Sequence, residues 1–224
     1  MEAEDKVLEH FESVSSDFEA VYEGGQDFWL YKLIDITFRN AILEKRRKLT
    51  IDLCGNVEGK NILDIGCGPG RYVVDLAQKK PESVLGVDMS ASMIEIAQRK
   101  ADALGLSKLC EFEMADFMKK NFEKRFDIVI ACGIFDYIYE PKAFLSKIRN
   151  VLNGRAIISF PVKWTLMTPL RMIWLAKRKC PNFYYTRSMI NKLLYSCGFR
   201  IEKVYKMGSF IVPGNYLVAC KVEK

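Results

Sequence analysis

The stretch NILDIGCGPGRYVVDLA, residues 61–77, constrains the fold more than any other part of the chain. An apolar run containing Asp64 leads into three glycines within five positions and then into a run with helical spacing. A strand that enters a glycine-rich turn and continues as a helix brings the backbone close to a ligand, because glycine has no Cβ to block the approach. Gly66, Gly68 and Gly70 are spaced as GxGxG, whereas a dinucleotide fingerprint needs GxGxxG and a P-loop needs GxxxxGK followed by Ser or Thr. The stretch predicts a nucleotide-like ligand or, taken alone, only a tight turn.

The chain that follows alternates between strand-like and helix-like runs. Short β-branched runs cover 61–65, 83–87, 109–114, 126–131 and 155–160, and amphipathic runs cover 71–80, 90–104 and 141–153. This alternation predicts an α/β fold with a Rossmann-like, doubly wound and mostly parallel sheet. Pro141 and Gly154 suit the start and the end of the third helix.

The C-terminal part departs from the alternation. A helix over 188–197 is followed by strand-like runs over 199–208 and 215–224, which are too close together for a crossover helix. We expect them to pair antiparallel at the end of the sheet, which makes a seven-stranded sheet with a terminal antiparallel strand.

Length and composition predict one domain over residues 1–224. Half of the 224 residues are apolar, so the chain can bury one substantial core. Within the domain we expect an N-terminal helical cap (1–55), a cofactor-binding core (60–160), a substrate lid inserted after the fifth strand (162–186) and a closing helix with two strands (187–224).

The location and the absence of a metal are also predicted from composition. The acidic start MEAEDK is unlike a signal peptide, and the apolar run 164–176 is too short for a membrane span and is broken by Pro169 and Arg171. We therefore expect a soluble, cytoplasmic protein. Seven scattered cysteines without a CxxC pair predict buried free thiols, and the single histidine, His10, argues against a metal site.

Three further motifs follow the next strands in turn. Asp88 ends the second strand, where its carboxylate would accept hydrogen bonds from a ribose diol. Ala115-Asp116-Phe117 follows the third strand and offers an acceptor for an exocyclic amine and a flat apolar face, and the small residues Ala131-Cys132-Gly133 end the fourth. Each motif also has a structural interpretation, such as helix capping by Asp88 and Ser90, but together they favour a cofactor site.

DIGCGPG and these motifs, in this order over about residues 60–160, resemble the class I S-adenosylmethionine-dependent methyltransferases. The resemblance implies S-adenosylmethionine as cofactor, S-adenosylhomocysteine as product, and no metal. It also implies a cofactor site that contains Tyr22, Asp64, Gly66, Cys67, Gly68, Gly70, Asp88, Met89, Met93, Ala115, Asp116, Phe117 and Cys132.

In that family the glycines approach the methionine and ribose, and Asp64 would support their loop. Met89 and Phe117 would flank the adenine, Asp116 would bind its amine, and Cys132 would line the floor. The N-terminal segment FESVSSDFEAVYEGG resembles the lid of small-molecule and quinone methyltransferases, in which Tyr22 would close over the cofactor. The alternative is that Tyr22 belongs to an apolar helical stripe.

Methyl transfer needs positioning more than acid–base chemistry, because the sulfonium methyl is already activated. Where many small-molecule relatives carry histidine after the fourth strand, this chain has Asp136 and Tyr137. We predict these two as the catalytic residues if an oxygen nucleophile must lose a proton, and as a cap and a pocket wall otherwise. An NPPY-type signature is absent, which argues against methylation of exocyclic amines.

Charge distribution predicts the acceptor. No acidic residue lies between Glu140 and Glu202, whereas twelve residues there are basic: Lys142, Lys147, Arg149, Arg155, Lys163, Arg171, Lys177, Arg178, Lys179, Arg187, Lys192 and Arg200. An anionic partner is therefore favoured. The same segment is rich in aromatic residues, and its candidate substrate-binding residues are Trp164, Arg171, Trp174, Tyr184 and Tyr185.

Several partners suit this segment. It would cover a small, apolar, anionic acceptor, and its order of elements resembles that of magnesium-protoporphyrin methyltransferases. An anionic membrane surface is a second partner, nucleic acid is less favoured because no RNA-binding module is present, and a solvated surface is the alternative. We predict a methyltransferase for a small acceptor, with oxygen favoured over nitrogen or carbon. RNA or protein methylation and a catalytically inactive, cofactor-binding partner subunit are the other hypotheses, and no oligomeric state is predicted.

Overall fold

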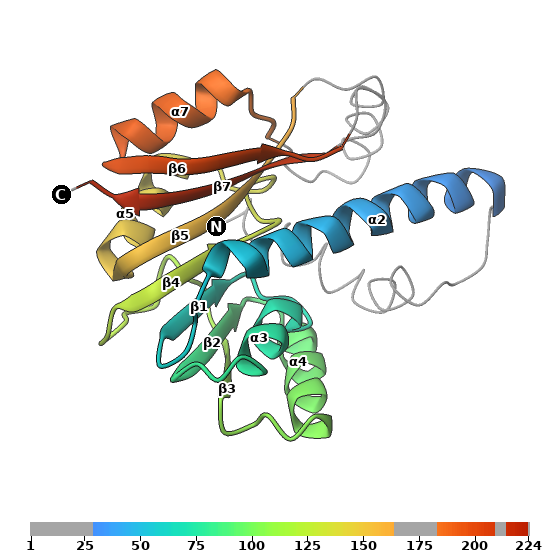
Figure 1. Ribbon diagram of the computed structural model, residues 1–224, viewed down its shortest axis with the longest axis vertical. Coiled ribbons are helices and arrows are strands. Elements are labelled where there is room, and N and C mark those ends of the chain that lie inside the picture. The colour runs from blue at the N-terminus through green and yellow to red at the C-terminus, as the bar shows by residue number, and fades with distance from the viewer. Residues whose placement is uncertain (1–28, 164–182, 209–213, 224) are drawn as a thin grey trace.

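The computed structural model describes residues 29–163, 183–208 and 214–223, which form a seven-stranded sheet with helices on both faces (Figure 1). The strand order is β3-β2-β1-β4-β5-β7-β6. The strands are β1 (Asn61–Ile65), β2 (Ser83–Asp88), β3 (Cys110–Met114), β4 (Phe126–Ala131), β5 (Leu152–Pro161), β6 (Phe199–Lys206) and β7 (Asn215–Val222). Strands β1 to β5 pair in parallel, and β7 pairs antiparallel with β5 and β6. The predicted fold is confirmed, with the antiparallel strand β7 last in the chain and second from the edge.

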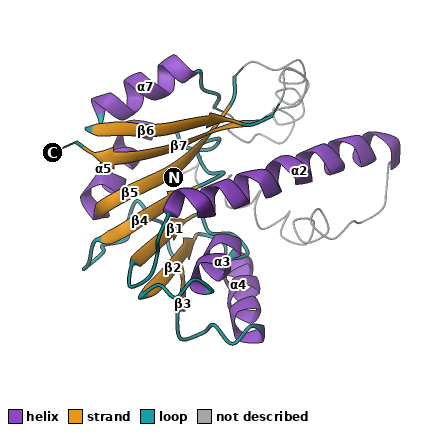
Figure 2. Ribbon diagram, viewed as in Figure 1, coloured by secondary structure: helices purple, strands orange, loops and turns teal. Residues whose placement is uncertain are grey.

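The helices form two layers, one on each face of the sheet (Figure 2). One layer contains α2 (Trp29–Cys54), α3 (Arg71–Ala77) and α4 (Ala91–Ala103), and the other contains α5 (Pro141–Val151) and α7 (Arg187–Ser196). Side chains alternate between the two faces of a strand, so β1 places Ile62 in the core beneath the first layer and Leu63 and Ile65 in the core beneath the second. Burial on both faces explains why the central strands β1 and β4 are mainly apolar, whereas the edge strand β3 carries Glu111 and Glu113.

The order of the strands fixes where a ligand can bind. β1 lies between β2 and β4, so the chain changes direction across the sheet after β3. Ligands of open α/β sheets bind beyond the carboxyl ends of the strands at such a switch point. The N-terminal part of α2 extends past these same ends in Figure 1.

The position of Gly154 differs from the one predicted from the sequence. We expected this glycine just beyond the end of the third helix, but α5 ends at Val151 and β5 begins at Leu152, which places Gly154 inside the strand. A Cβ at Gly154 would collide with the backbone oxygen of Asp127. The glycine therefore allows close approach of β4, beside a register shift in the β4–β5 pair, and does not cap the helix.

Other predictions from composition can be compared only over the described residues. The six cysteines there are buried free thiols, as expected. In the same ranges, no helix has both the length and the apolarity to cross a bilayer, and no three His, Cys, Asp or Glu side chains gather as metal ligands would. The division of residues 1–224 into four parts stays a prediction.

Candidate functional site

The glycine loop after β1 is tied to the end of β2. The backbone N–H groups of Gly66 and Cys67 both donate to the carbonyl oxygen of Val87, at 2.8 and 3.1 Å. Gly66, Gly68 and Gly70 have φ angles of 67°, 50° and 72°, in the left-handed region that other residues seldom adopt. The loop thus turns sharply at the carboxyl ends of β1 and β2 before α3 begins.

The three glycines have different neighbours. A Cβ at Gly66 would collide with Ile134, and a Cβ at Gly70 would lie 2.8 Å from the Cβ of Ala97. At Gly68, no atom of the described residues lies within 4 Å of the Cβ position. Gly66 and Gly70 therefore permit internal packing, whereas Gly68 leaves room for a ligand to approach the backbone.

Asp88 connects this loop to the start of α4. Its Oδ2 accepts a hydrogen bond from the backbone N–H of Gly68 at 2.8 Å, and its Oδ1 accepts one from Ser90 at 3.0 Å. Burial raises the pKa of Asp88, and these backbone donors oppose that rise. Ser90 itself caps α4, because its hydroxyl accepts from the N–H of Met93 at 3.4 Å. A carboxylate has further lone pairs, so Asp88 retains capacity to accept from a ligand hydroxyl.

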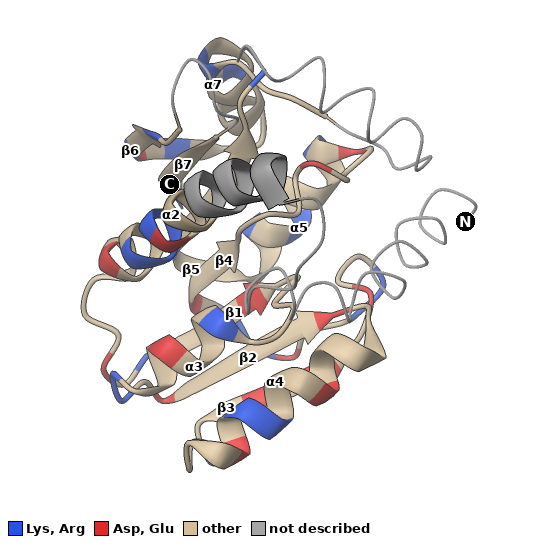
Figure 3. Cartoon of the chain, turned by 90° about the vertical axis from the view of Figure 1, so that its right-hand side faces the viewer, with Lys and Arg blue, Asp and Glu red and all other residues tan. Residues whose placement is uncertain are grey.

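Asp64 is a buried carboxylate beneath the same loop. The residue is 1% exposed, and its Oδ2 has no hydrogen-bond partner among the described residues. Burial, followed by the negative charge of Asp88, raises the pKa of Asp64, and the positive charge of Arg46 opposes the rise. Buried polar atoms are normally satisfied, so Oδ2 of Asp64 is suited to a donor supplied by a ligand. In Figure 3, red marks the acidic residues near the carboxyl ends of both β1 and β2.

Arg46 of α2 is a site residue that the sequence analysis missed. Its guanidinium nitrogens lie 3.5 Å from the Cβ position at Gly133, just after β4. One turn later on α2, the fully buried Thr50 lies with its hydroxyl 3.8 Å from the sulfur of Cys132. These contacts place the Arg46 charge at the carboxyl end of β4, near Asp64. Arg46 stands within the basic run EKRRK (44–48), and spacing along the chain does not distinguish which of these cations faces the core.

The turn after β3 carries the predicted adenine-binding residues. The N–H of Ala115 donates to the carbonyl of Asp88 at 2.9 Å, which joins this turn to β2. The carboxylate of Asp116 accepts from the N–H of Met118 at 2.8 Å and forms an ion pair with Lys119 at 3.0 Å. Asp116 thus follows β3 where Asp88 ends the neighbouring strand β2, and its role toward adenine stays a prediction.

The apolar residues of the predicted site differ in exposure. Met89 is 37% exposed, whereas Phe117 is 5% exposed and packs against Phe144 with ring centroids 5.0 Å apart. The side chains of three other predicted residues are also buried: Cys67, Met93 and Cys132. Met89 is therefore the predicted residue best placed to offer an open apolar surface.

The predicted catalytic residues lie in the loop after β4. Asp136 is 6% exposed, and Tyr137 is half-buried. The segment that begins at Phe183 returns to this loop, since the N–H of Phe183 donates to the carbonyl of Asp136 at 2.9 Å. Tyr184 is half-buried there, while Tyr185 is 6% exposed and packs 5.1 Å from the ring of Phe160. Burial and the charge of Asp136 raise the pKa of Tyr185 to about 12.

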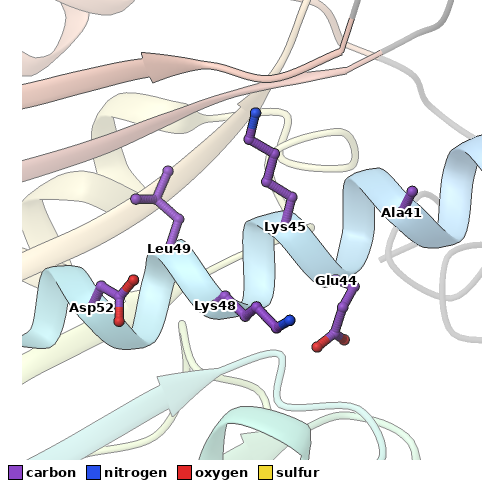
Figure 4. Close-up of a pocket in the computed structure, with 6 residues that line it drawn as sticks. All are labelled: Ala41, Glu44, Lys45, Lys48, Leu49 and Asp52. Carbon is purple, nitrogen blue, oxygen red and sulfur yellow. The ribbon is translucent and has the colours of Figure 1, made fainter.

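Four predicted residues lie outside the described ranges: Tyr22, Trp164, Arg171 and Trp174. A surface hollow on α2 is lined by Ala41, Glu44, Lys45, Lys48, Leu49 and Asp52 (Figure 4). All six belong to one helix, and none of them is a residue of the glycine loop. The strand ends, where several elements converge, are the better candidate site.

A family described as a methyltransferase domain matches residues 56–197, well over half of the chain. The chain belongs to the class I S-adenosylmethionine-dependent methyltransferases. The predicted resemblance is thereby confirmed. The carboxy-S-adenosyl-L-methionine synthase of Campylobacter jejuni is 35% identical to this methyltransferase-family chain over 123 residues, which are 48% of each protein. The chain therefore spans about half the length of the curated relatives it matches.

Solved structures extend the likeness of fold to nearly the whole chain. Magnesium protoporphyrin IX methyltransferase from Synechocystis PCC 6803, with bound SAH, is 22% identical and aligns with a TM-score of 0.77, covering 97% of this chain and 98% of that one. The [4+2]-cyclase SpnF is 16% identical, with a TM-score of 0.74 and coverage of 97% and 96%. At these identities the likeness establishes the methyltransferase fold alone.

The glycines predict separable effects of substitution. Gly70→Ala should destabilise the fold by about 1–2 kcal/mol through left-handed strain and by about 1–3 kcal/mol more through its contact with Ala97. Gly68→Ala should destabilise the fold through backbone strain alone. It should also weaken S-adenosylhomocysteine binding about tenfold or more, because the added methyl group would occupy space that the ligand needs. Urea denaturation and titration calorimetry measure the two effects. Gly59→Ala, also left-handed and open, is the control for strain alone. Undiminished binding by Gly68→Ala would contradict the assignment.

Asp64 predicts a dependence of stability on pH. Its pKa is raised in the folded state, so the folded chain binds more protons than the unfolded chain above the ordinary value of 3.8, and stability falls as pH rises through that window. The slope from this group is at most about 1.4 kcal/mol per pH unit. Asp64→Asn removes it, so the free energy of unfolding of the variant should rise relative to wild type between pH 4.5 and 7. Parallel pH profiles would show that Asp64 is not the group responsible.

Proposed function

We propose that this chain transfers the methyl group of S-adenosylmethionine to a small, apolar, anionic acceptor, with an oxygen atom as the favoured nucleophile. The observation that carries the proposal is the open backbone of Gly68, held by Asp88 and lying above the buried Asp64 at the switch point of the sheet. Fold alone does not decide the reaction, since one relative is named as a carboxy-S-adenosyl-L-methionine synthase and one structural neighbour as a [4+2]-cyclase.

The residues present fit the polar groups of this cofactor. Asp88 would accept hydrogen bonds from the ribose diol, and Asp116 would accept from the exocyclic amine of adenine. Asp64 would face the ammonium group, which satisfies a buried carboxylate. Arg46 would bind the carboxylate of the methionine portion, since a guanidinium pairs with carboxylates in charge-assisted hydrogen bonds. Met89 would cover one face of the adenine.

The sulfonium of the cofactor supplies an activated methyl group, so the protein must chiefly orient the acceptor and exclude water. Asp136 and Tyr137 follow β4 beside this position, and the segment from Phe183 closes on the same loop. We assign to Asp136 the removal of a proton from an acceptor hydroxyl, with Tyr137 orienting the acceptor. Asp136 is 6% exposed, so bulk water is largely kept from its carboxylate, which would act as the base when an acceptor hydroxyl lies within hydrogen-bond distance of it.

The acceptor class rests on the basic and aromatic character of the segment after β5. The candidate acceptor-binding residues are Trp164, Arg171, Trp174, Tyr184 and Tyr185, of which the last two lie beside the Asp136 loop. Cations with aromatic side chains suit a flat apolar molecule that carries carboxylates or phosphates. A soluble, cytoplasmic location stays part of the proposal. Contact with an anionic membrane surface stays a further hypothesis, and nucleic acid stays a less favoured one.

Variants of the neighbouring residues Arg46 and Arg47 form a matched pair that tests the cofactor site. Arg46→Met should weaken S-adenosylhomocysteine binding about tenfold or more, because it removes the partner of the cofactor carboxylate. Arg47→Met, the next residue, breaks an ion pair with Asp75 and should lower the melting temperature without changing the dissociation constant at 20 °C. Calorimetric titration and thermal unfolding measure both quantities. Equal loss of affinity in the two variants would remove Arg46 from the proposed site.

The function is tested by transfer of labelled methyl from S-adenosylmethionine into a cell extract, partitioned into organic-soluble, small aqueous, and RNA or protein fractions. We expect label in the organic fraction, and its loss with Asp136→Asn while cofactor affinity is kept. Label confined to RNA or protein would overturn the acceptor class. Cofactor binding without label in any fraction would favour the inactive partner-subunit hypothesis.

A further inference from the structure

The turn after β3 is held by a residue of α5, a helix that follows it in the chain by more than twenty residues. Within the turn, the carbonyl of Asp116 accepts from the N–H groups of Lys119 and Lys120 at 3.0 and 2.9 Å, and its carboxylate accepts from Met118. These bonds wind residues 116–120 into a single turn that begins at Asp116. They do not by themselves fix how the turn sits on the sheet.

Lys147 of α5 holds the end of this turn. Its ammonium nitrogen donates to the carbonyl oxygens of Met118 and Lys120, both at 2.7 Å. The same nitrogen lies 5.4 Å from the centroid of the Phe117 ring, within the range of a cation–π contact. A cation at the carbonyl end of a helical turn is favourable, because the peptide dipoles point their negative ends there.

α5 fixes the turn from a second direction. Phe117 packs on Phe144, which stands one turn before Lys147 on the same helix, with ring centroids 5.0 Å apart. The ring is thus held between an aromatic side chain and an ammonium group of one helix. Partial burial lowers the pKa of Lys147, and the negative charge of Asp116 opposes that change.

We propose that Lys147 is a positioning residue for adenine recognition. By holding the turn at Met118, Lys120 and Phe117, it sets where the Asp116 carboxylate stands and so where it accepts the exocyclic amine. Lys147 touches neither cofactor nor acceptor. The inference rests on the proposed function, because it requires a ligand that contains adenine.

The experiment compares S-adenosylhomocysteine with S-inosylhomocysteine, in which the exocyclic amine is replaced by a carbonyl group. Wild type should bind the adenosyl compound more tightly. Lys147→Met should reduce that preference about tenfold, because the displaced carboxylate no longer meets the amine. Lys147→Arg, which keeps donors for both carbonyls, should restore most of it. Lys142→Met, an exposed lysine on the same helix, is the control for charge and should match wild type.

A double-mutant cycle with Asp116→Asn separates positioning from general stability. If Lys147 acts through Asp116, the loss of preference in Asp116→Asn should not increase when Lys147→Met is added. Lys147→Gln serves in both tests if the methionine variant does not fold.

A lower melting temperature with an unchanged adenosyl-to-inosyl ratio would overturn the inference, since Lys147 would then be structural only. Additive losses in the double variant would also overturn it. Failure of wild type to bind either compound would instead refute the proposed function, and the inference with it.

Discussion

The carboxylate of Asp88 organises the whole candidate site. Two backbone N–H groups, from Gly68 after β1 and Ser90 before α4, converge on one half-buried side chain. The carbonyl of the same residue accepts from Ala115 after β3. Asp88 therefore adds side-chain hydrogen bonds to the glycine loop and to the start of α4, at a place where pairing within the sheet already joins the ends of β1, β2 and β3.

This arrangement has an electrostatic cost that the site offsets locally. Burial favours the protonated form of a carboxylate, and Asp64 adds a second buried acid nearby. Backbone donors stabilise the charged form of Asp88, whereas Asp64 has Arg46 as its principal opposite charge. A cationic ligand would relieve the repulsion between the two acids, so the apo site is electrostatically disposed toward a positively charged molecule.

Local patterns in the sequence were sufficient to predict the strands, most helix boundaries and the glycine loop, because each depends on neighbours within a few residues. Gly154 was misassigned since its close contact is with Asp127 of an adjacent strand, which spacing along the chain does not reveal. Arg46 was missed for a similar reason: which of four consecutive cations faces the sheet depends on how α2 docks. The family resemblance implies that Phe117 flanks the adenine; its ring is 5% exposed and packs on Phe144, and its role toward the cofactor stays a prediction.

Counting the charges of the basic segment between Glu140 and Glu202 also does not show where these side chains lie in the fold. The sequence places twelve cations between Glu140 and Glu202, but two of them are committed to internal contacts. Arg155 donates to Glu202 at 2.7 Å and to the carbonyl of Leu53 at 2.9 Å, which joins β5 to β6 and to the end of α2. Lys147 holds the turn after β3. A run of like charge in sequence is therefore not one surface, and the argument for an anionic acceptor depends on fewer residues than the count suggests.

The two halves of the site are specified by different parts of the chain. Cofactor-side residues come from strand ends and from helices that pack on the sheet, so the fold itself determines their geometry. On the proposed acceptor side, Asp136 and Phe183 are joined by a backbone hydrogen bond, and the ring of Tyr185 packs among core aromatic rings. These contacts tie the loop after β4 and the segment from Phe183 to the aromatic core. Proteins similar to this chain are named for different reactions, so the fold alone does not fix the acceptor.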